Sequence, residues 1–235
     1  MFRPKWKLAL EIIDQIRGWG LTDRVVLADA GYGESTGFRQ ELERRQLRYI
    51  VVGPPVGVWL EPPQPTLLQP RRMGRPPTAW HYGEQRPLSV KAVAQQAKGW
   101  KTIGWREGTQ GRLQSRFWAG RVQPSHGFHE GQPPHKEVWL LEWPESEKEP
   151  IKYFFCDLPA DYSLRRLVRL AKCRWKIEQD YQQLKEELGL DHYEGRSWQG
   201  WHHHVTLAMM AHAFLTLETL RSKKNYWVDP AEDAP

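Results

Sequence analysis

The spacing of apolar residues along the first fifty positions predicts alternating helices and strands. Apolar side chains recur at helical spacing over residues 6–17, and glycines follow, which predicts an amphipathic helix. Short apolar runs predict buried strands at residues 24–28 and 49–52. Between them, Ser35 or Thr36 can cap a helix over residues 37–45. A strand, a helix and a second strand with short connections indicate a parallel pair and an α/β fold class.

The character of the sequence changes after Gly53. Nine of the 18 prolines fall between positions 54 and 87, which excludes regular structure over much of that stretch. Aromatic-rich or alternating segments then predict strands at residues 116–122, 137–143 and 151–156. We therefore expect a β-rich insertion over residues 54–158. It contains seven of the 13 tryptophans, most of which are expected to pack within the sheet.

Helical spacing returns in the last third of the chain. Asp161 or Ser163 caps a predicted helix that runs to about residue 188, and a final helix is expected over residues 204–220. The apolar stripe of the long helix carries Glu178. A carboxylate on such a stripe must be paired or bind a metal, because an unpaired buried charge is costly. An ion pair with Arg174, one turn earlier, is the alternative to a functional role.

Asp29 stands at the C-terminal end of the first predicted strand, directly before a glycine-containing turn. Open α/β folds collect their functional groups at this end of their strands. Two alternatives remain open at this point. Asp29 can bond its own backbone as a turn aspartate, or the turn can cradle a phosphate, although the complete glycine fingerprint is absent.

Basic residues accumulate at the start of the long predicted helix. Between Tyr162 and Ile177 there is no acidic residue and there are six basic ones, which are Arg165, Arg166, Arg169, Lys172, Arg174 and Lys176. Such a helix face can meet a phosphate backbone or can simply be solvated.

Composition narrows the class of protein without deciding it. The 235 residues carry 34 Lys and Arg against 28 Asp and Glu, and the resulting net charge of +6 permits a nucleic-acid partner. A hydrophobic content of 40% excludes a wholly disordered chain. No apolar stretch reaches the ~18 residues of a membrane span, so no membrane partner is expected. Two cysteines cannot form a disulfide framework, which favours a reducing, cytoplasmic location.

Two segments resemble the catalytic motifs of DDE-type insertion-sequence transposases. VVLADAGYG, residues 25–33, is similar to the segment that carries their second catalytic aspartate. RWKIEQDYQQLK, residues 174–185, is similar to the segment with their final catalytic glutamate in the branch that has a β-rich insertion before it. The arginine four residues before Glu178 and the lysine seven residues after it match that pattern. Residues 189–207 are also similar to the sequence that follows the motif.

The resemblance implies an RNase H-like fold in which carboxylates hold two divalent metals, usually Mg²⁺. Asp29 and Glu178 would be metal ligands and catalytic residues, while Arg174 and Lys185 would contact phosphates or orient Glu178. Arg165, Arg166, Arg169, Lys172 and Lys176 are the expected DNA-binding residues. Carboxylate oxygens suit Mg²⁺, and a two-metal site activates the attacking oxygen and stabilises the leaving oxygen of a phosphodiester displacement.

The first catalytic aspartate of such enzymes should lie on an earlier strand. Only Asp14 and Asp23 precede Asp29; the first falls within a predicted helix and the second in a turn, so neither can replace it. We therefore expect the C-terminal part of a transposase, with an incomplete RNase H-like fold and no activity as a chain alone. The expected division is residues 1–53 and 159–222 for this core, 54–158 for the insertion and 223–235 for a tail.

The function expected from these motifs is DNA transposition. The partners would be insertion-sequence ends, target DNA, and a second copy of the chain or a full-length transposase. Two alternatives remain: a non-catalytic DNA-binding fragment of a transposase, and a metal-dependent nuclease unrelated to transposition.

Overall fold

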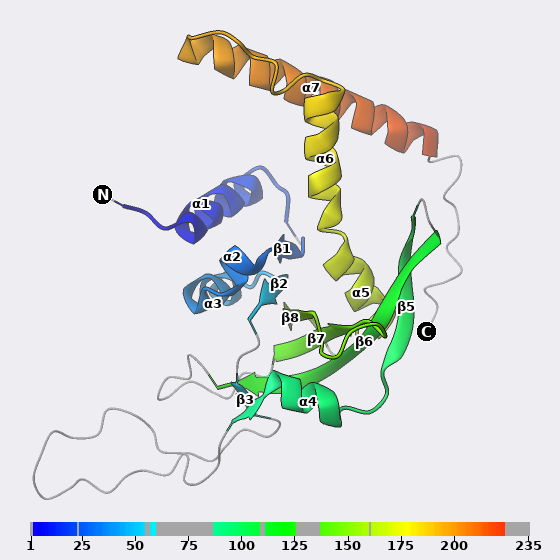
Figure 1. Cartoon of the computed structure of the whole chain (residues 1–235). Coiled ribbons are helices and arrows are strands. Elements are labelled where there is room, and N and C mark those ends of the chain that lie inside the picture. The colour runs from blue at the N-terminus through cyan, green and yellow to red at the C-terminus, as the bar shows by residue number, and fades with distance from the viewer. Residues whose placement is uncertain are drawn as a thin grey trace, which may run out of the picture. The chain divides into compact units, whose positions relative to one another are not determined.

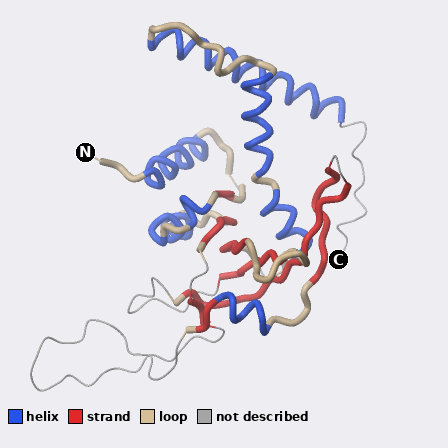
Figure 2. The backbone as a smooth tube through the Cα atoms, viewed as in Figure 1, coloured by secondary structure: helices blue, strands red, loops and turns tan. Residues whose placement is uncertain are grey.

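The computed structural model describes residues 2–22, 24–54, 57–59, 87–108, 111–125, 137–159 and 161–223 (Figure 1). The chain divides into two compact units, Met1–Cys173 and Arg174–Pro235. The first unit is mixed α/β, and the described part of the second is helical (Figure 2). Most of the proline-rich segment and the predicted tail, residues 60–86 and 224–235, lie outside the described residues.

The first unit is built on one mixed sheet. Its strands are β1 (Val26–Ala28), β2 (Tyr49–Gly53), β3 (Gly57–Trp59), β4 (Leu88–Ser89), β5 (Lys101–Gly108), β6 (Gly111–Pro124), β7 (Glu137–Trp143) and β8 (Lys152–Asp157). Their order is β1-β2-β8-β7-β6-β3-β4, with β5 paired to β6. β1 and β2 are parallel and the other pairs are antiparallel. The predicted parallel pair and the α/β fold class are confirmed.

Helices cover both faces of this sheet. They are α1 (Lys5–Gly18), α2 (Ala30–Gly33), α3 (Thr36–Arg44), α4 (Val90–Gln96) and α5 (Leu164–Lys172). One apolar cluster joins α1, α3 and α4 to alternate residues of the sheet, such as Val51, Trp139 and Phe155. A second cluster joins α5 to the intervening residues, such as Ile50. Successive side chains of a strand point to opposite faces, so strands buried on both faces read as continuous apolar runs.

The connection between β1 and β2 is set by helix α3. Ser35 caps it, because its Oγ accepts a hydrogen bond from the backbone N–H of Phe38 at 3.3 Å. At the other end Gln46 takes a left-handed conformation with φ of 56°. The N–H of Leu47 then donates to the carbonyl of Leu42 at 2.9 Å, which closes the helix and leads into β2.

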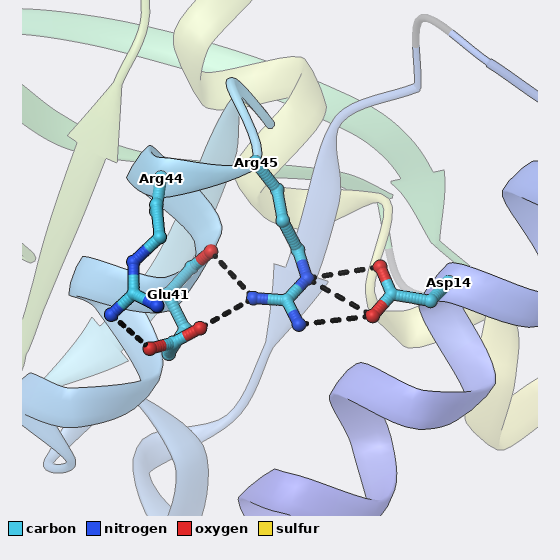
Figure 3. A network of polar contacts seen from close by, with 4 residues as sticks. All are labelled: Asp14, Glu41, Arg44 and Arg45. Atoms are coloured by element: carbon cyan, nitrogen blue, oxygen red, sulfur yellow. Dashed lines mark hydrogen bonds and ion pairs between the residues drawn. The ribbon is translucent and has the colours of Figure 1, made fainter.

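An ion-pair network joins α1 to α3 (Figure 3). The Arg45 guanidinium lies between two carboxylates, with its Nε 2.9 Å from Asp14 Oδ1 and its Nη1 2.6 Å from Glu41 Oε2. Arg44 pairs with the other oxygen of Glu41 at 2.6 Å. The hydrogen bond from Arg45 holds the pKa of the Asp14 carboxyl below its ordinary value of 3.8. Asp14 therefore has a structural partner within the first unit.

We expect Asp14→Asn to lower the stability of the first unit by about 0.5–1 kcal/mol at neutral pH, the range for partly exposed ion pairs. The depressed pKa of Asp14 stabilises the fold fully above the unfolded value of 3.8, and this contribution is lost as pH falls through the folded pKa. Urea denaturation of both proteins between pH 7 and pH 2.5 measures the difference. A difference that stays constant down to pH 2.5 would contradict the assignment.

Several predicted elements differ from those observed. The turn after Asp29 is a short helix, α2. The long helix predicted up to residue 188 is two helices, α5 and α6 (Trp175–Glu186), because the chain breaks at Cys173 and Arg174. The final helix, α7 (Trp198–Lys223), begins six residues earlier than predicted. The strands β3, β4 and β5 and the helix α4 were not predicted.

The second unit consists of α6, α7 and the segment that links them. Gly189 ends α6 with φ of 65°, in the left-handed region that glycine adopts without strain. Its carbonyl lies 2.9 Å from Nε2 of His204 on α7, which ties the start of that helix to the end of α6. Among the described residues, no helix combines the length and apolar character that a membrane crossing requires.

Candidate active site

Asp29 lies at the C-terminal tip of β1 and caps the start of α2. Its backbone carbonyl accepts hydrogen bonds from the N–H groups of Tyr32 and Gly33, at 3.2 and 2.9 Å. Its carboxylate makes no capping bond, and among the described residues it has no hydrogen-bond or ion-pair partner. The side chain is exposed. The backbone of Asp29 is therefore fixed by the turn while its carboxylate stays open to solvent, unlike a turn aspartate that bonds its own backbone.

The turn that follows Asp29 is packed closely on β2. A Cβ atom on Gly33 would lie 1.8 Å from the carbonyl oxygen of Val52, so this position accepts glycine alone. The buried guanidinium of Arg39 donates to the Gly33 carbonyl and lies 4.5 Å from the centre of the Phe155 ring. Sequence reasoning missed Arg39. Its burial could have been predicted, because Arg39 shares one side of α3 with the apolar Phe38 and Leu42.

Glu178 lies in the first turn of α6, in the second unit. Its carboxylate is 65% exposed and accepts a hydrogen bond from Arg174 Nη2 at 2.8 Å. The structure therefore brings Glu178 and Arg174 together as the i,i+4 ion pair that the spacing allowed. Asp29 belongs to the first unit and Glu178 to the second. Neither unit alone contains both predicted metal ligands.

The predicted phosphate-binding residues differ in their surroundings. Arg165, Arg166 and Arg169 are exposed on α5, and Lys176 and Lys185 are exposed on α6. Arg166 stacks its guanidinium on the Tyr162 ring, 4.0 Å from the ring centre. These side chains are accessible to a polyanion in the described structure.

Lys172 differs from the other basic residues of α5. Its ammonium donates to both oxygens of Glu142 on β7, at 2.6 and 2.7 Å, and lies 4.2 Å from the centre of the Trp105 ring. The two side chains are only 13% and 4% exposed. Burial lowers the pKa of the Lys172 amine, and the bond to Glu142 opposes that shift. Lys172 is engaged inside the first unit and does not present its charge to DNA here.

The tryptophans of the predicted insertion pack mainly within the protein. Trp139 is fully buried and meets Phe155 with ring centres 4.4 Å apart. Trp100 and Trp143 form an edge-to-face pair at 5.4 Å. Trp198, which lies outside the insertion, is 73% exposed and stacks on Trp201. A contact between an insertion tryptophan and a DNA base stays a prediction; Trp80 lies outside the described residues.

The donor set matches a hard divalent cation by ligand type. Asp29 offers two carboxylate oxygens without a competing partner among the described residues, and oxygen ligands of this kind suit Mg²⁺. Glu178 shares its carboxylate with Arg174. The described part of the chain contains no group of three or more His, Cys, Asp or Glu side chains close enough to hold a metal. Of the two predicted metal ligands, Asp29 is the one whose carboxylate has no competing partner among the described residues.

Open α/β sheets bind their ligands beyond the carboxyl ends of the strands, where Asp29 lies, and a carboxylate there is compatible with metal-dependent chemistry. Comparison with protein families agrees: residues 1–112 match the family of DDE superfamily endonucleases. This match supports the DDE-type transposase domain that the motifs predicted. No curated protein matches the chain.

The family match bears on the general activity. It includes Asp29 and ends before Glu178, so the predicted aspartate lies in the matched segment and the predicted glutamate does not. A nuclease- or transposase-type function is supported, and the family implies DNA as substrate. Nucleases of this superfamily generally use divalent metals.

Proposed function

We propose that the chain acts in DNA transposition, as part of a catalytic domain that cleaves and joins phosphodiesters at insertion-sequence ends. The observation that carries this proposal is the open carboxylate of Asp29 at the strand tip, inside the segment that matches DDE superfamily endonucleases. Asp29 and Glu178 would hold Mg²⁺, and residues 54–158 would be an insertion between two parts of an RNase H-like core. The metal would stabilise the attacking and leaving oxygens of the displacement.

The protein's own residues would have separate tasks in this reaction. Arg39 and Gly33 fix the turn that presents the Asp29 carboxylate. Arg174 holds Glu178 in one orientation through its ion pair, and Lys185 would contact a phosphate. Arg165, Arg166, Arg169 and Lys176 would bind the DNA backbone, whereas Lys172 would serve mainly to anchor α5 to the sheet through Glu142.

A non-catalytic DNA-binding role is the second candidate. It is favoured by one observation: Asp14, the described aspartate upstream of Asp29, is engaged by Arg45 and so is not free to act as a third metal ligand. In that case the chain would occupy DNA ends beside a second copy or a full-length transposase.

We expect the 235-residue chain alone to bind DNA without nicking or joining it in Mg²⁺ or Mn²⁺, because two carboxylates under-coordinate a two-metal site. Incubation with a labelled supercoiled plasmid and with labelled linear ends measures both reactions. Nicking by the unaltered chain that disappears in Asp29→Asn would establish catalysis and contradict the expected inactivity. Nicking that persists in Asp29→Asn would contradict the role of Asp29.

The same assay separates transposition from general nuclease activity. Binding or cleavage confined to insertion-sequence ends supports the transposase function. Equal action on unrelated DNA of the same length would instead favour a metal-dependent nuclease. A chain that fails to bind any DNA at ~50 mM salt, where phosphate contacts are strongest, would contradict both.

A further inference from the structure

A pocket of about 230 Å³ lies where α1 ends and where β1 and β2 begin. It is lined by Arg17, Thr22, Arg24, Gln46, Leu47 and Arg48. Three of the lining residues are arginines, and no acidic residue lines the pocket among the described residues. Asp23, next to Arg24 in the sequence, is not among those residues. The lining is that of an anion site, because every charged group in it is positive.

The three arginines of this pocket have no ion-pair partner among the residues that the structure describes. Within the described part of the chain, none of them lies within 4.0 Å of an Asp or Glu oxygen. Arg17 is near enough to lower the pKa of Asp14, but that carboxylate is bound by Arg45. Like charges that line one pocket repel one another, and a bound polyanion reduces that cost.

Arg48 connects this pocket to the start of α5. Its Nη1 lies 3.5 Å from the hydroxyl oxygen of Tyr162, so the guanidinium donates to that group. The Arg166 guanidinium stacks on the ring of the same tyrosine. Tyr162 also lines a second pocket, of about 290 Å³, to which Arg121 contributes. Tyr162 therefore contacts both Arg48 and Arg166, which are 118 residues apart in the sequence.

We propose that Arg17, Arg24, Arg48 and Arg166, called the arginine track, bind consecutive phosphates of a DNA backbone. This inference rests on the proposed function, which supplies DNA as the ligand. It adds which surface of the first unit contacts the DNA. Arg24 and Arg48 precede the parallel strands β1 and β2, whose first residues pair in register. Phosphate contacts fix position and orientation of a duplex without reading its sequence.

The track lies at the opposite end of β1 from Asp29. Asp29 is five positions after Arg24, which is ~17 Å for an extended chain. Duplex DNA rises about 3.4 Å per base pair along each strand, so ~17 Å corresponds to about five base pairs. A duplex that ran from the track along β1 would cover this distance in about five base pairs. The track would position DNA and would take no part in the chemistry.

The test compares the full chain with Arg48→Gln and with the control Arg3→Gln. Arg3 is exposed on the first unit and paired with Glu11, so its loss changes the net charge equally without touching the track. We expect Arg48→Gln to weaken binding of a 30-base-pair duplex at least five-fold at 100 mM salt. The slope of log K against log salt should decrease by about 1, the loss of one phosphate contact. Arg3→Gln should change neither quantity.

Two further variants make the result specific. Tyr162→Phe keeps the ring under Arg166 and removes the oxygen that holds Arg48, so it should weaken binding about two- to three-fold. Arg48→Lys keeps the charge and should recover part of the affinity. Thermal unfolding of each variant within a few degrees of the unaltered chain shows that folding is retained.

The outcomes separate this inference from the proposed function. Unaltered DNA binding by Arg48→Gln, or equal losses in Arg48→Gln and Arg3→Gln, would overturn the track and leave the proposed function standing. Absence of DNA binding by the unaltered chain would overturn both. Inhibition by inorganic phosphate as strong as that by a duplex of equal phosphate content would show a small-anion site and would also overturn the track.

Discussion

Replacing Gly33 with alanine is expected to destabilise the first unit by about 3 kcal/mol or more. The added Cβ would lie 1.8 Å from the carbonyl oxygen of Val52 and 2.8 Å from its carbonyl carbon. Overpacking commonly costs about 1–3 kcal/mol, and a clash with backbone is harder to relieve than one with a flexible side chain. α2 would have to move away from β2, which would open the hydrogen bond from the Gly33 N–H to the Asp29 carbonyl.

Gly31→Ala is the matched control, because Gly31 lies in the same helix. A Cβ there would meet Asp29 Oδ1 at 3.4 Å, an ordinary contact. Alanine in place of a helical glycine is neutral or stabilises by up to about 1 kcal/mol. Hydrogen exchange of the amides of residues 29–35, together with urea denaturation, measures both variants. Equal stability of the two variants would contradict the close packing of α2 on β2.

The pattern of the sequence predicted the centre of the fold and missed its periphery, for physical reasons. β2, β7 and β8 are buried on both faces and β1 is partly buried on both, and their continuous apolar runs predicted them as strands. β5 mixes lysine, glycine and arginine with its apolar residues and changes register between Gly104 and Arg106, so no alternation marks it. α4 has only seven residues, too few for a helical period to emerge.

No feature of the sequence predicted the break between α5 and α6. Neither Gly nor Pro lies at Cys173 or Arg174, and Arg174 keeps helical φ and ψ angles of −56° and −31°. The apolar spacing therefore continues through the break. The prediction that Glu178 lies on a core-facing stripe depended on that continuity, and Glu178 is exposed in the structure.

The candidate site was predicted in part. Asp29 was recognised from its place after an apolar run and before a glycine turn, and that place is observed. What supports Asp29 comes from elsewhere in the chain: Arg39 on α3 and Val52 on β2. The proposed arginine track likewise joins residues distant in sequence. Arg166 was predicted to bind DNA, whereas Arg17, Arg24 and Arg48 are isolated charges in the sequence and come together only through the strand order.

Replacing Lys172 with methionine is expected to destabilise the first unit by about 3–5 kcal/mol. The substitution keeps the approximate length of the side chain but removes the partner of the Glu142 carboxylate. Glu142 is only 3% exposed, so its carboxylate would be left buried and unpaired. Removal of one member of a buried ion pair costs this much because the remaining charge is uncompensated. Contacts of the ammonium with the Trp105 and Phe117 rings, at 4.2 and 5.5 Å, are lost as well.

The double variant Lys172→Met/Glu142→Met distinguishes a lost charge partner from lost packing. Apolar residues of similar volume often replace a buried pair without net cost, so the double variant should recover most of the stability lost by Lys172→Met. Arg169→Met, on the exposed side of the same helix, should change stability by less than about 0.5 kcal/mol. Urea denaturation measures all three. A double variant less stable than Lys172→Met would mean that the pair does not act as a unit, and that α5 is held by the surrounding apolar contacts instead.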